Sequence, residues 1–490
     1  MPDRHEGVSA TPTSRLVGLV LGPALAVLTW LLGPPEGFSE TGWLTASLAV
    51  LMAVWWMTEA LPLAVTALLP LPLLPALGVV DTSEAAAPYA SPIVFLFLGG
   101  FLIAAAIQRW ALHRRMALAI MALVGAQPER LVAGVMAGSA LLSMWISNTA
   151  TAAMMLPIAL SIATFADGGH GEGADRDADR FTIALLLGIA FGANIGGIGT
   201  LIGTPPNAVF AGFLADSYDI QVGFVQWMAV GVPTALVLLV GAWWLLARVT
   251  FRVGNEPLPG VPEYVASERA TLGPLSQPQR RLLVVAALTV LAWLFRPVLE
   301  GLVPGLALSD PGIAITAALA LFIVPAERWQ GPALLVWQDS RQVAWGVLLL
   351  VGGGLSLGSA IESSGLAGDL AEALQAAGDL PVWGLLFLVA ALTMGLSHIT
   401  SNTGTAATLM PVAVGLAFSL GESPVVFGAM IALAASCAFM LPVATPPNAI
   451  VFSSDRVRVL DMLRGGAPIN AVALVVVVAI GAFWVPFALG

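Results

Sequence analysis

Residues 147–153 read Ser-Asn-Thr-Ala-Thr-Ala-Ala, and residues 401–407 read Ser-Asn-Thr-Gly-Thr-Ala-Ala. Each copy lies in a long apolar stretch and is followed by a second repeated string, Gly-Thr-Pro-Pro-Asn-Ala at 203–208 and Ala-Thr-Pro-Pro-Asn-Ala at 444–449. In lipid, irregular backbone is stable only where it is buried in protein or lines a watery cavity. Polar breaks at corresponding places of two halves therefore indicate the binding site of a transporter.

The composition is that of a polytopic membrane protein. Of the 490 residues, 58% are hydrophobic and 10% are charged, and the mean hydropathy is +0.92, which is outside the range of soluble globular domains. All 19 basic residues are arginine. The single cysteine, Cys437, lies in an apolar run, which excludes disulfides within the chain and cysteine-based metal sites.

The sequence of the first half predicts four membrane spans followed by a hairpin. Apolar segments of roughly 17 to 25 residues cross about 30 Å of hydrocarbon. As one straight helix, residues 131–164 would be about 51 Å long, too long for one crossing and too short for two. We therefore expect a re-entrant hairpin there, with Ser147–Thr149 at its tip. The four spans before it are expected at 16–33, 41–57, 60–80 and 92–109.

The second half repeats this plan after a polar, proline-rich linker at 248–281. Ser147 and Ser401 are 254 residues apart, and the same offset relates further residues over about 60 positions. It falls to 241 at the Thr-Pro-Pro-Asn strings, a difference close to the length of a polar insert at 165–180 that is expected to be a surface loop. The later elements are expected at 282–303, 311–325, 342–361, 382–420 (a second hairpin), 424–452 (a broken span) and 467–488.

These patterns predict an all-α polytopic membrane protein with about 11 transmembrane helices, two opposed re-entrant hairpins and an inverted-topology repeat. The repeats are expected at 1–247 and 282–490. Arginine placement gives the orientation. With a cytoplasmic N-terminus and an external C-terminus, every arginine except Arg296 falls on the cytoplasmic side, so the two hairpins open from opposite faces.

The repeated strings predict four helix N-termini near the middle of the membrane. Ser, Thr and Asn are favoured N-caps and Pro is favoured at the first helical position, so Thr204-Pro205 and Thr445-Pro446 each start a half-helix. The strings Ser147-Asn148-Thr149 and Ser401-Asn402-Thr403 are expected to cap the return arms of the hairpins likewise. Each N-terminus carries roughly half a positive charge and free N–H donors, and four of them together suit a dianion.

The arms that arrive at these breaks end in free carbonyls, which are hard oxygen ligands for a small cation. Side-chain oxygens are added by Ser143, Asn148, Ser397 and Asn402. Carboxylates inside the membrane, the usual proton relay, are nearly absent from the predicted spans, because the candidates fall at span ends. Sodium is therefore favoured over protons as the coupling ion.

The four strings together resemble those of the divalent anion/sodium symporter family of di- and tricarboxylate carriers. The resemblance covers nearly the whole chain and implies eleven spans, two opposed hairpins and a homodimer in the lipid bilayer. It also implies scaffold and transport domains, each drawn from both halves, and an elevator-like movement of the transport domain. The implied function is sodium-coupled symport of C4-dicarboxylates such as succinate, malate and fumarate, in the cell inner membrane. Sodium ions are the implied co-transported cofactor, and neither enzymatic activity nor a nucleic-acid partner is expected.

Carried over position by position, the resemblance assigns two sodium sites and a substrate site. The first sodium site would be Ser143, Ser147, Asn148 and Gly203. The second would be Ser397, Thr400, Asn402 and Ala444. The substrate contacts would be Ser147, Asn148, Thr149, Thr204, Pro205, Ser401, Asn402, Thr403, Thr445 and Pro446.

This chain departs from the family pattern beside the second sodium site. Ser397 stands where Thr is expected, and His398 stands where an acidic or neutral residue is expected. A histidine there suits either a structural hydrogen-bonder or the cation of a sodium-independent dicarboxylate exchanger. A sodium-coupled citrate or sulfate transporter also fits the repeated strings. A membrane-embedded enzyme would normally need acids with Mg²⁺, or a Ser and His constellation, and we find neither in the sequence.

Overall fold

The computed structural model of the 490-residue chain describes residues 12–167, 174–302, 307–327, 331–369, 372 and 382–489. These residues form helices, and β-pairing among them is limited to an isolated bridge between Pro325 and Ala333. The expected all-α fold is confirmed.

The first part of the chain packs two long apolar helices, α1 (Pro12–Leu32) and α2 (Glu40–Thr58), against each other. The span expected at 60–80 is divided into α3 (Leu63–Thr66) and α4 (Pro70–Ala76), because prolines lack the N–H that a continuous helix needs. The fourth expected span is confirmed as α6 (Pro92–Arg109). It is preceded by the short helices α5 (Thr82–Ala86) and η1 (Ala87–Ala90) and followed by α7 (Leu112–Val124).

The first hairpin consists of α8 (Pro128–Ser143) and α9 (Asn148–Asp167), slightly longer than the expected 131–164. Helix α9 and helix α10 (Ala174–Gly197) both extend into the polar insert, so the loop expected at 165–180 is too long. After the break come α11 (Pro205–Tyr218) and α12 (Phe224–Trp244), which continues as a π-helical turn, η2 (Leu245–Thr250).

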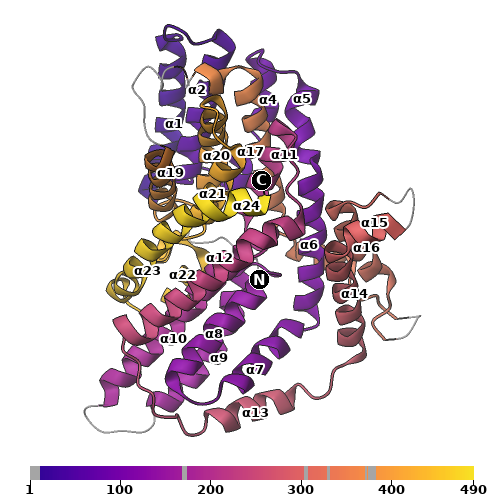
Figure 1. Ribbon diagram of the computed structural model, residues 1–490, viewed down its shortest axis with the longest axis vertical. Coiled ribbons are helices and arrows are strands. Elements are labelled where there is room, and N and C mark those ends of the chain that lie inside the picture. Colours follow the sequence, from indigo (N-terminus) through magenta and orange to yellow (C-terminus); the bar gives the residue numbers. More distant parts are fainter. Residues whose placement is uncertain are drawn as a thin grey trace.

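The expected linker at 248–281 contains α13 (Val261–Thr271) and ends early, because α14 (Gln277–Leu294) begins within it behind a Ser276 capping box. In Figure 1, α13 runs along the lower edge of the molecule and leads to a separate group of helices at the right. Helix α14 bends by 77° into α15. The group is completed by α15 (Arg296–Leu302), α16 (Asp310–Ile323) and η3 (Trp337–Gln342).

The second hairpin consists of α19 (Val382–Ser397) and α20 (Asn402–Ser419), close to the expected 382–420. In Figure 1 these helices lie in the upper half of the view, and α8 and α9 lie in the lower half. Helix α17 (Trp345–Ser363) precedes this hairpin. The broken span after it consists of α21 (Pro424–Ala435), η4 (Pro442–Ala444) and α22 (Pro446–Phe452). The last span consists of α23 (Val459–Ala479), η5 (Ile480–Trp484) and α24 (Val485–Leu489).

Within the described residues, eight helices are long and apolar enough to cross a membrane, or nine if the bent pair α14 and α15 is one span. Four shorter apolar helices of 10–17 residues accompany them, if α3 and α4 are taken together as one helix (Leu63–Ala76). The chain is therefore a multi-pass integral membrane protein. The figure of eleven spans stays a prediction, since α21 and α22 are each too short to cross alone and are separated by a break.

Two glycines from equivalent positions allow helices of the two halves to touch. A Cβ at Gly99 in α6 would lie 2.6 Å from the backbone of Ala314 in α16, and a Cβ at Gly353 in α17 would clash with the backbone of Ala67. Small residues of this kind let helix backbones approach closely in a membrane protein. Each half thus packs its central helix on the other half.

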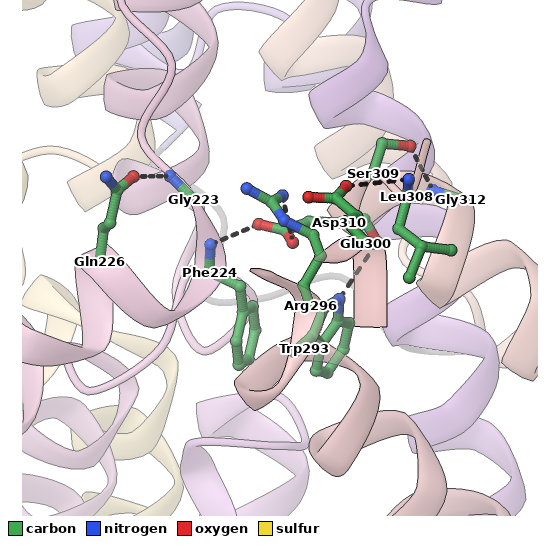
Figure 2. Close-up of polar contacts among 10 residues, drawn as sticks. All are labelled: Gly223, Phe224, Gln226, Trp293, Arg296, Glu300, Leu308, Ser309, Asp310 and Gly312. Atoms are coloured by element: carbon green, nitrogen blue, oxygen red, sulfur yellow. Dashed lines mark hydrogen bonds and ion pairs between the residues drawn. The ribbon is translucent and has the colours of Figure 1, made fainter. Parts of the chain in front are cut away.

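Arg296, the arginine that the predicted orientation does not place on the cytoplasmic side, is paired. Its guanidinium donates to Asp310 Oδ1 at 2.9 Å, and the other carboxylate oxygen accepts the Phe224 N–H at 2.6 Å (Figure 2). The rings of Phe224 and Trp293 stack beneath this contact, with centroids 4.1 Å apart. Asp310 therefore joins the start of α12 to the group α14–α16.

Candidate functional site

Both hairpin tips place their Ser-Asn-Thr string at the start of the return helix. Ser147 Oγ accepts the Ala150 N–H at 3.2 Å, and Ser401 Oγ accepts the Gly404 N–H at 3.4 Å. The predicted caps are confirmed at both tips. Because the serine at each tip satisfies one backbone donor, the other N–H groups of the first turn remain available to a ligand.

The Thr-Pro-Pro strings start half-helices, as expected from the proline positions. Thr445 Oγ1 accepts the Asn448 N–H at 3.3 Å, whereas Thr204 lies at the cap position of α11 without a side-chain cap bond. The capping prediction is therefore right for both helix starts, and right for the threonine side chain only in the second half.

The asparagine that ends each Thr-Pro-Pro-Asn string holds the preceding loop in place. Its Nδ2 donates to carbonyls of the loop between the two half-helices, and in each half one of these carbonyls, Thr200 O or Leu441 O, also accepts a backbone N–H of the loop, from Gly203 or Ala444. The matched contacts lie 241 residues apart. They are Asn207 to Gly197 O (3.2 Å) and Thr200 O (2.8 Å), and Asn448 to Ala438 O (3.2 Å) and Leu441 O (2.9 Å).

The structure brings together three of the four residues expected at the first sodium site, Ser143, Asn148 and Gly203, whereas the hydroxyl of Ser147 caps α9. Ser143 Oγ hydrogen-bonds to Asn148 Oδ1 across the hairpin tip. A Cβ at Gly197 would lie 2.8 Å from Asn148 Oδ1 and 3.1 Å from the Gly203 carbonyl oxygen, so these oxygens face one small space. Thr200 Oγ1 donates to Met144 O at 2.6 Å and ties the loop to the hairpin. Hydroxyl, amide and carbonyl oxygens are a donor set that suits Na⁺.

The equivalent residues of the second hairpin, Ser397 and Asn402, are not hydrogen-bonded to each other through these oxygens. Ser397 Oγ and Asn402 Oδ1 are buried and have no hydrogen-bond partner in the described part of the chain. A buried oxygen without a partner carries a desolvation penalty of about 1–3 kcal/mol, which a bound cation would remove. These two orphaned oxygens fit the second predicted sodium site. No hydrogen bond within the described ranges joins Ala444 to them.

Two neighbours of that pair are already engaged. Thr400 Oγ1 contacts Leu396 O at 3.1 Å and Thr405 Oγ1 at 2.6 Å, so its hydroxyl serves the hairpin itself. His398 is 4% exposed, with Nδ1 2.7 Å from Met394 O and Nε2 3.3 Å from Asn470 Oδ1. Both ring nitrogens therefore face acceptor oxygens within the protein, and a neutral imidazole, which has one N–H, can donate to one of the two.

The proposed substrate residues differ in exposure. Ser147, Thr149 and Pro446 are exposed; Thr204, Thr403 and Thr445 are buried. The remaining four are half-buried: Asn148, Pro205, Ser401 and Asn402. None of these side chains is charged, so positive potential at this site comes from the helix N-termini. Among the described residues, no cluster of three or more His, Cys, Asp or Glu side chains is placed to hold a metal ion.

Asn194 was missed by the sequence reasoning. It lies in α10 and is 1% exposed, and its Nδ2 donates to Thr445 Oγ1 at 2.9 Å and to Asn448 Oδ1 at 3.3 Å. The available signal was an amide side chain inside a run of small and apolar residues, shortly before the break. The sequence assigns Asn207 and Asn448 no role beyond their place in the repeated strings.

Two helical hairpins with polar tips, set beside two broken helices in a largely apolar chain, define a polytopic secondary transporter. The family described as sodium:sulfate symporter transmembrane region matches residues 13–489. The chain belongs to this family, which confirms the resemblance seen in the repeated strings.

Similar proteins in staphylococci carry the name sodium-dependent dicarboxylate transporter SdcS. The protein from Staphylococcus saprophyticus is 37% identical over 97% of this chain and 92% of its own length. One from Staphylococcus aureus is 35% identical over 98% of this chain and 92% of its own length. The solved YdaH transporter from Alcanivorax borkumensis has a TM-score of 0.59 at 16% identity, covering 90% of this chain and 98% of that one. At this identity the likeness shows the fold alone.

Proposed function

We propose that this protein is a sodium-coupled symporter of C4-dicarboxylates such as succinate, malate and fumarate, and not an enzyme. The observation that carries the proposal is the pair of orphaned oxygens, Ser397 Oγ and Asn402 Oδ1, at the tip of a hairpin. Their equivalents, Ser143 and Asn148, bond to each other beside the Gly203 carbonyl. Both sets supply uncharged oxygens, which favour a hard monovalent cation that is shed again on the other side.

The substrate class follows from the charge of the site. The donors are hydroxyls, amides and backbone N–H groups at helix starts, without an arginine or lysine side chain among the proposed contacts. Together with bound sodium ions, helix N-termini of roughly half a charge each balance a dianion. The names of the staphylococcal relatives support a dicarboxylate over citrate or sulfate.

We further propose an inverted repeat, with the two hairpins opening from opposite faces of the cell inner membrane and the N-terminus in the cytoplasm. A transport domain would comprise α8–α12 and α19–α23, and a scaffold would comprise α1–α6 and α14–α17. The matched roles of Asn207 and Asn448 and the reciprocal packing of Gly99 and Gly353 support the repeat. An elevator-like movement of the transport domain in a homodimer would give alternating access.

The test is uptake of radiolabelled succinate into proteoliposomes under an inward sodium gradient. We expect concentrative uptake that collapses when potassium or choline replaces sodium. Equal uptake in potassium would refute sodium coupling and favour an exchanger. Uptake of labelled sulfate or citrate in place of every dicarboxylate would refute the substrate class.

A further inference from the structure

The hydroxyl of Thr445 is held by a side chain from the other half of the chain. Asn194 Nδ2, in α10, donates to Thr445 Oγ1 at 2.9 Å, and the Asn448 backbone N–H donates to the same oxygen at 3.3 Å. Two donors fill the acceptor capacity of one hydroxyl, which has two lone pairs and one proton. No hydrogen bond donated by Thr445 Oγ1 is found among the described residues, so its proton remains free.

The orientation of the Asn194 amide is fixed by its surroundings. Asn448 Nδ2 is committed to two carbonyls of the second break, at 3.2 and 2.9 Å, so Asn448 presents its Oδ1 to Asn194. An amide facing this oxygen must present its nitrogen. Asn194 Oδ1 is consequently left buried without a partner in the described structure, a cost of about 1–3 kcal/mol that an alanine would avoid.

The first half lacks this arrangement. Position 435, which is 241 residues after Asn194, is alanine. Correspondingly Asn207 Oδ1, the equivalent of the Asn448 oxygen, has no partner within the described ranges, and Thr204 makes no side-chain cap bond. The amide is thus specific to one of two otherwise matched threonines, which points to a role for this threonine beyond capping a helix.

We propose that Asn194 is a positioning residue that makes Thr445 a donor-only hydroxyl, aimed at a carboxylate oxygen of the substrate. The inference rests on the proposed function. A hydroxyl whose lone pairs are both occupied gains nothing from a ligand donor, and a carboxylate accepts hydrogen bonds without donating any. Thr445 then fixes one carboxylate in the second half, while the hydroxyl of Thr204 stays free to turn.

The test is a double-mutant cycle on succinate uptake in proteoliposomes at saturating sodium. Thr445→Val removes the donor and is expected to raise the succinate KM about tenfold or more, the usual effect of one hydrogen bond to a charged group. Asn194→Ala is expected to raise KM at least threefold with Vmax within about twofold. In the Thr445→Val background, Asn194→Ala should change KM by less than twofold, because the hydroxyl it positions is gone.

A purely structural amide would behave differently. It would lower Vmax or the folded fraction and give the same fold-change in both backgrounds, and either of these results, or an unchanged KM in Asn194→Ala, overturns the inference. Asn194→Leu, which preserves side-chain volume, repeats the test if the alanine variant is poorly folded by size-exclusion chromatography. Failure of the unmutated protein to transport any dicarboxylate would instead refute the proposed function before the variants are compared.

Discussion

At the residue scale, the two hairpin asparagines have different surroundings, and this predicts a different effect on stability. Asn402 Oδ1 has no partner in the described structure, so Asn402→Ala removes no hydrogen bond to that oxygen. We expect its melting temperature without sodium to equal that of the unmutated protein, whereas Asn148→Ala breaks the bond to Ser143 and melts slightly lower. Single hydrogen bonds inside membrane proteins average well under about 2 kcal/mol, so both variants should fold.

Both variants should nevertheless lose succinate uptake, because each lacks a proposed sodium ligand. The stabilisation that sodium gives to the unmutated protein by binding the folded state should also shrink in each. Thermal unfolding with and without sodium chloride, with choline chloride as the ionic-strength control, measures this. Aggregation of both variants during purification would contradict the assigned role and favour packing.

His398 gives a second prediction at this scale. Its Nε2 reaches Asn470, which in turn bonds Cys437 O at 2.6 Å and the Phe439 N–H at 3.2 Å in the break after α21. His398→Gln retains a group able to bond Asn470 and should preserve sodium dependence. His398→Ala loses the link and should raise the sodium concentration for half-maximal uptake several-fold. Sodium-independent counterflow of dicarboxylates that disappears in His398→Gln would contradict this and indicate an exchanger.

The sequence points to the candidate site because the chain contains its polar strings twice, and a repeat at a constant offset argues against chance occurrence. It could not assign roles within the strings. Thr400 and Thr445 both look like free hydroxyls in the sequence, yet the first is bonded to Thr405 and the second is held by Asn194, 251 residues away. Contacts between side chains so distant in sequence depend on the three-dimensional packing.

At the element scale, the Asp310 carboxylate makes polar contacts that join α12 to α14–α16, beside the stacked rings of Phe224 and Trp293 (Figure 2). Asp310→Ala leaves the Phe224 N–H and the Arg296 guanidinium without this partner and is expected to cost about 3 kcal/mol of stability. Arg296→Gln should cost about 1 kcal/mol or less, because the side chain of Arg296 is 34% exposed and solvent screens its charge. Thermal unfolding of both purified variants gives the order, and an equal loss would contradict it.

The long, strongly apolar helices could be predicted from the sequence. The errors lie where a proline or an N-cap determines where a helix begins or ends. The span expected at 60–80 has the composition of a membrane helix, but its prolines divide it into α3 and α4. The linker expected to run to residue 281 ends near Ser276, whose capping box starts α14 among polar residues. Hydropathy records how apolar a segment is and contains no information on these local hydrogen bonds.

At the scale of the whole molecule, the elevator proposal requires the transport domain to move past the scaffold. Ser91, at the start of α6 in the scaffold, donates to Asp216 near the end of α11 in the transport domain, with the oxygens 2.9 Å apart. Because the two side chains touch and α6 packs against α11, cysteines at these positions are chosen as a candidate disulfide pair, whose formation Ellman titration verifies. The one native cysteine, Cys437, is fully buried, so it should not compete for oxidation.

We expect the oxidised Ser91→Cys/Asp216→Cys protein to bind succinate and sodium but to transport neither, because the disulfide keeps α11 beside α6 and prevents the transport domain from moving past the scaffold. Reduction with dithiothreitol should restore uptake. Each single-cysteine variant, oxidised in parallel, controls for loss of the hydrogen bond itself. Ellman titration must show that the free thiols have been consumed. A fully oxidised protein that transports succinate as fast as the dithiothreitol-reduced protein would refute movement between α6 and α11.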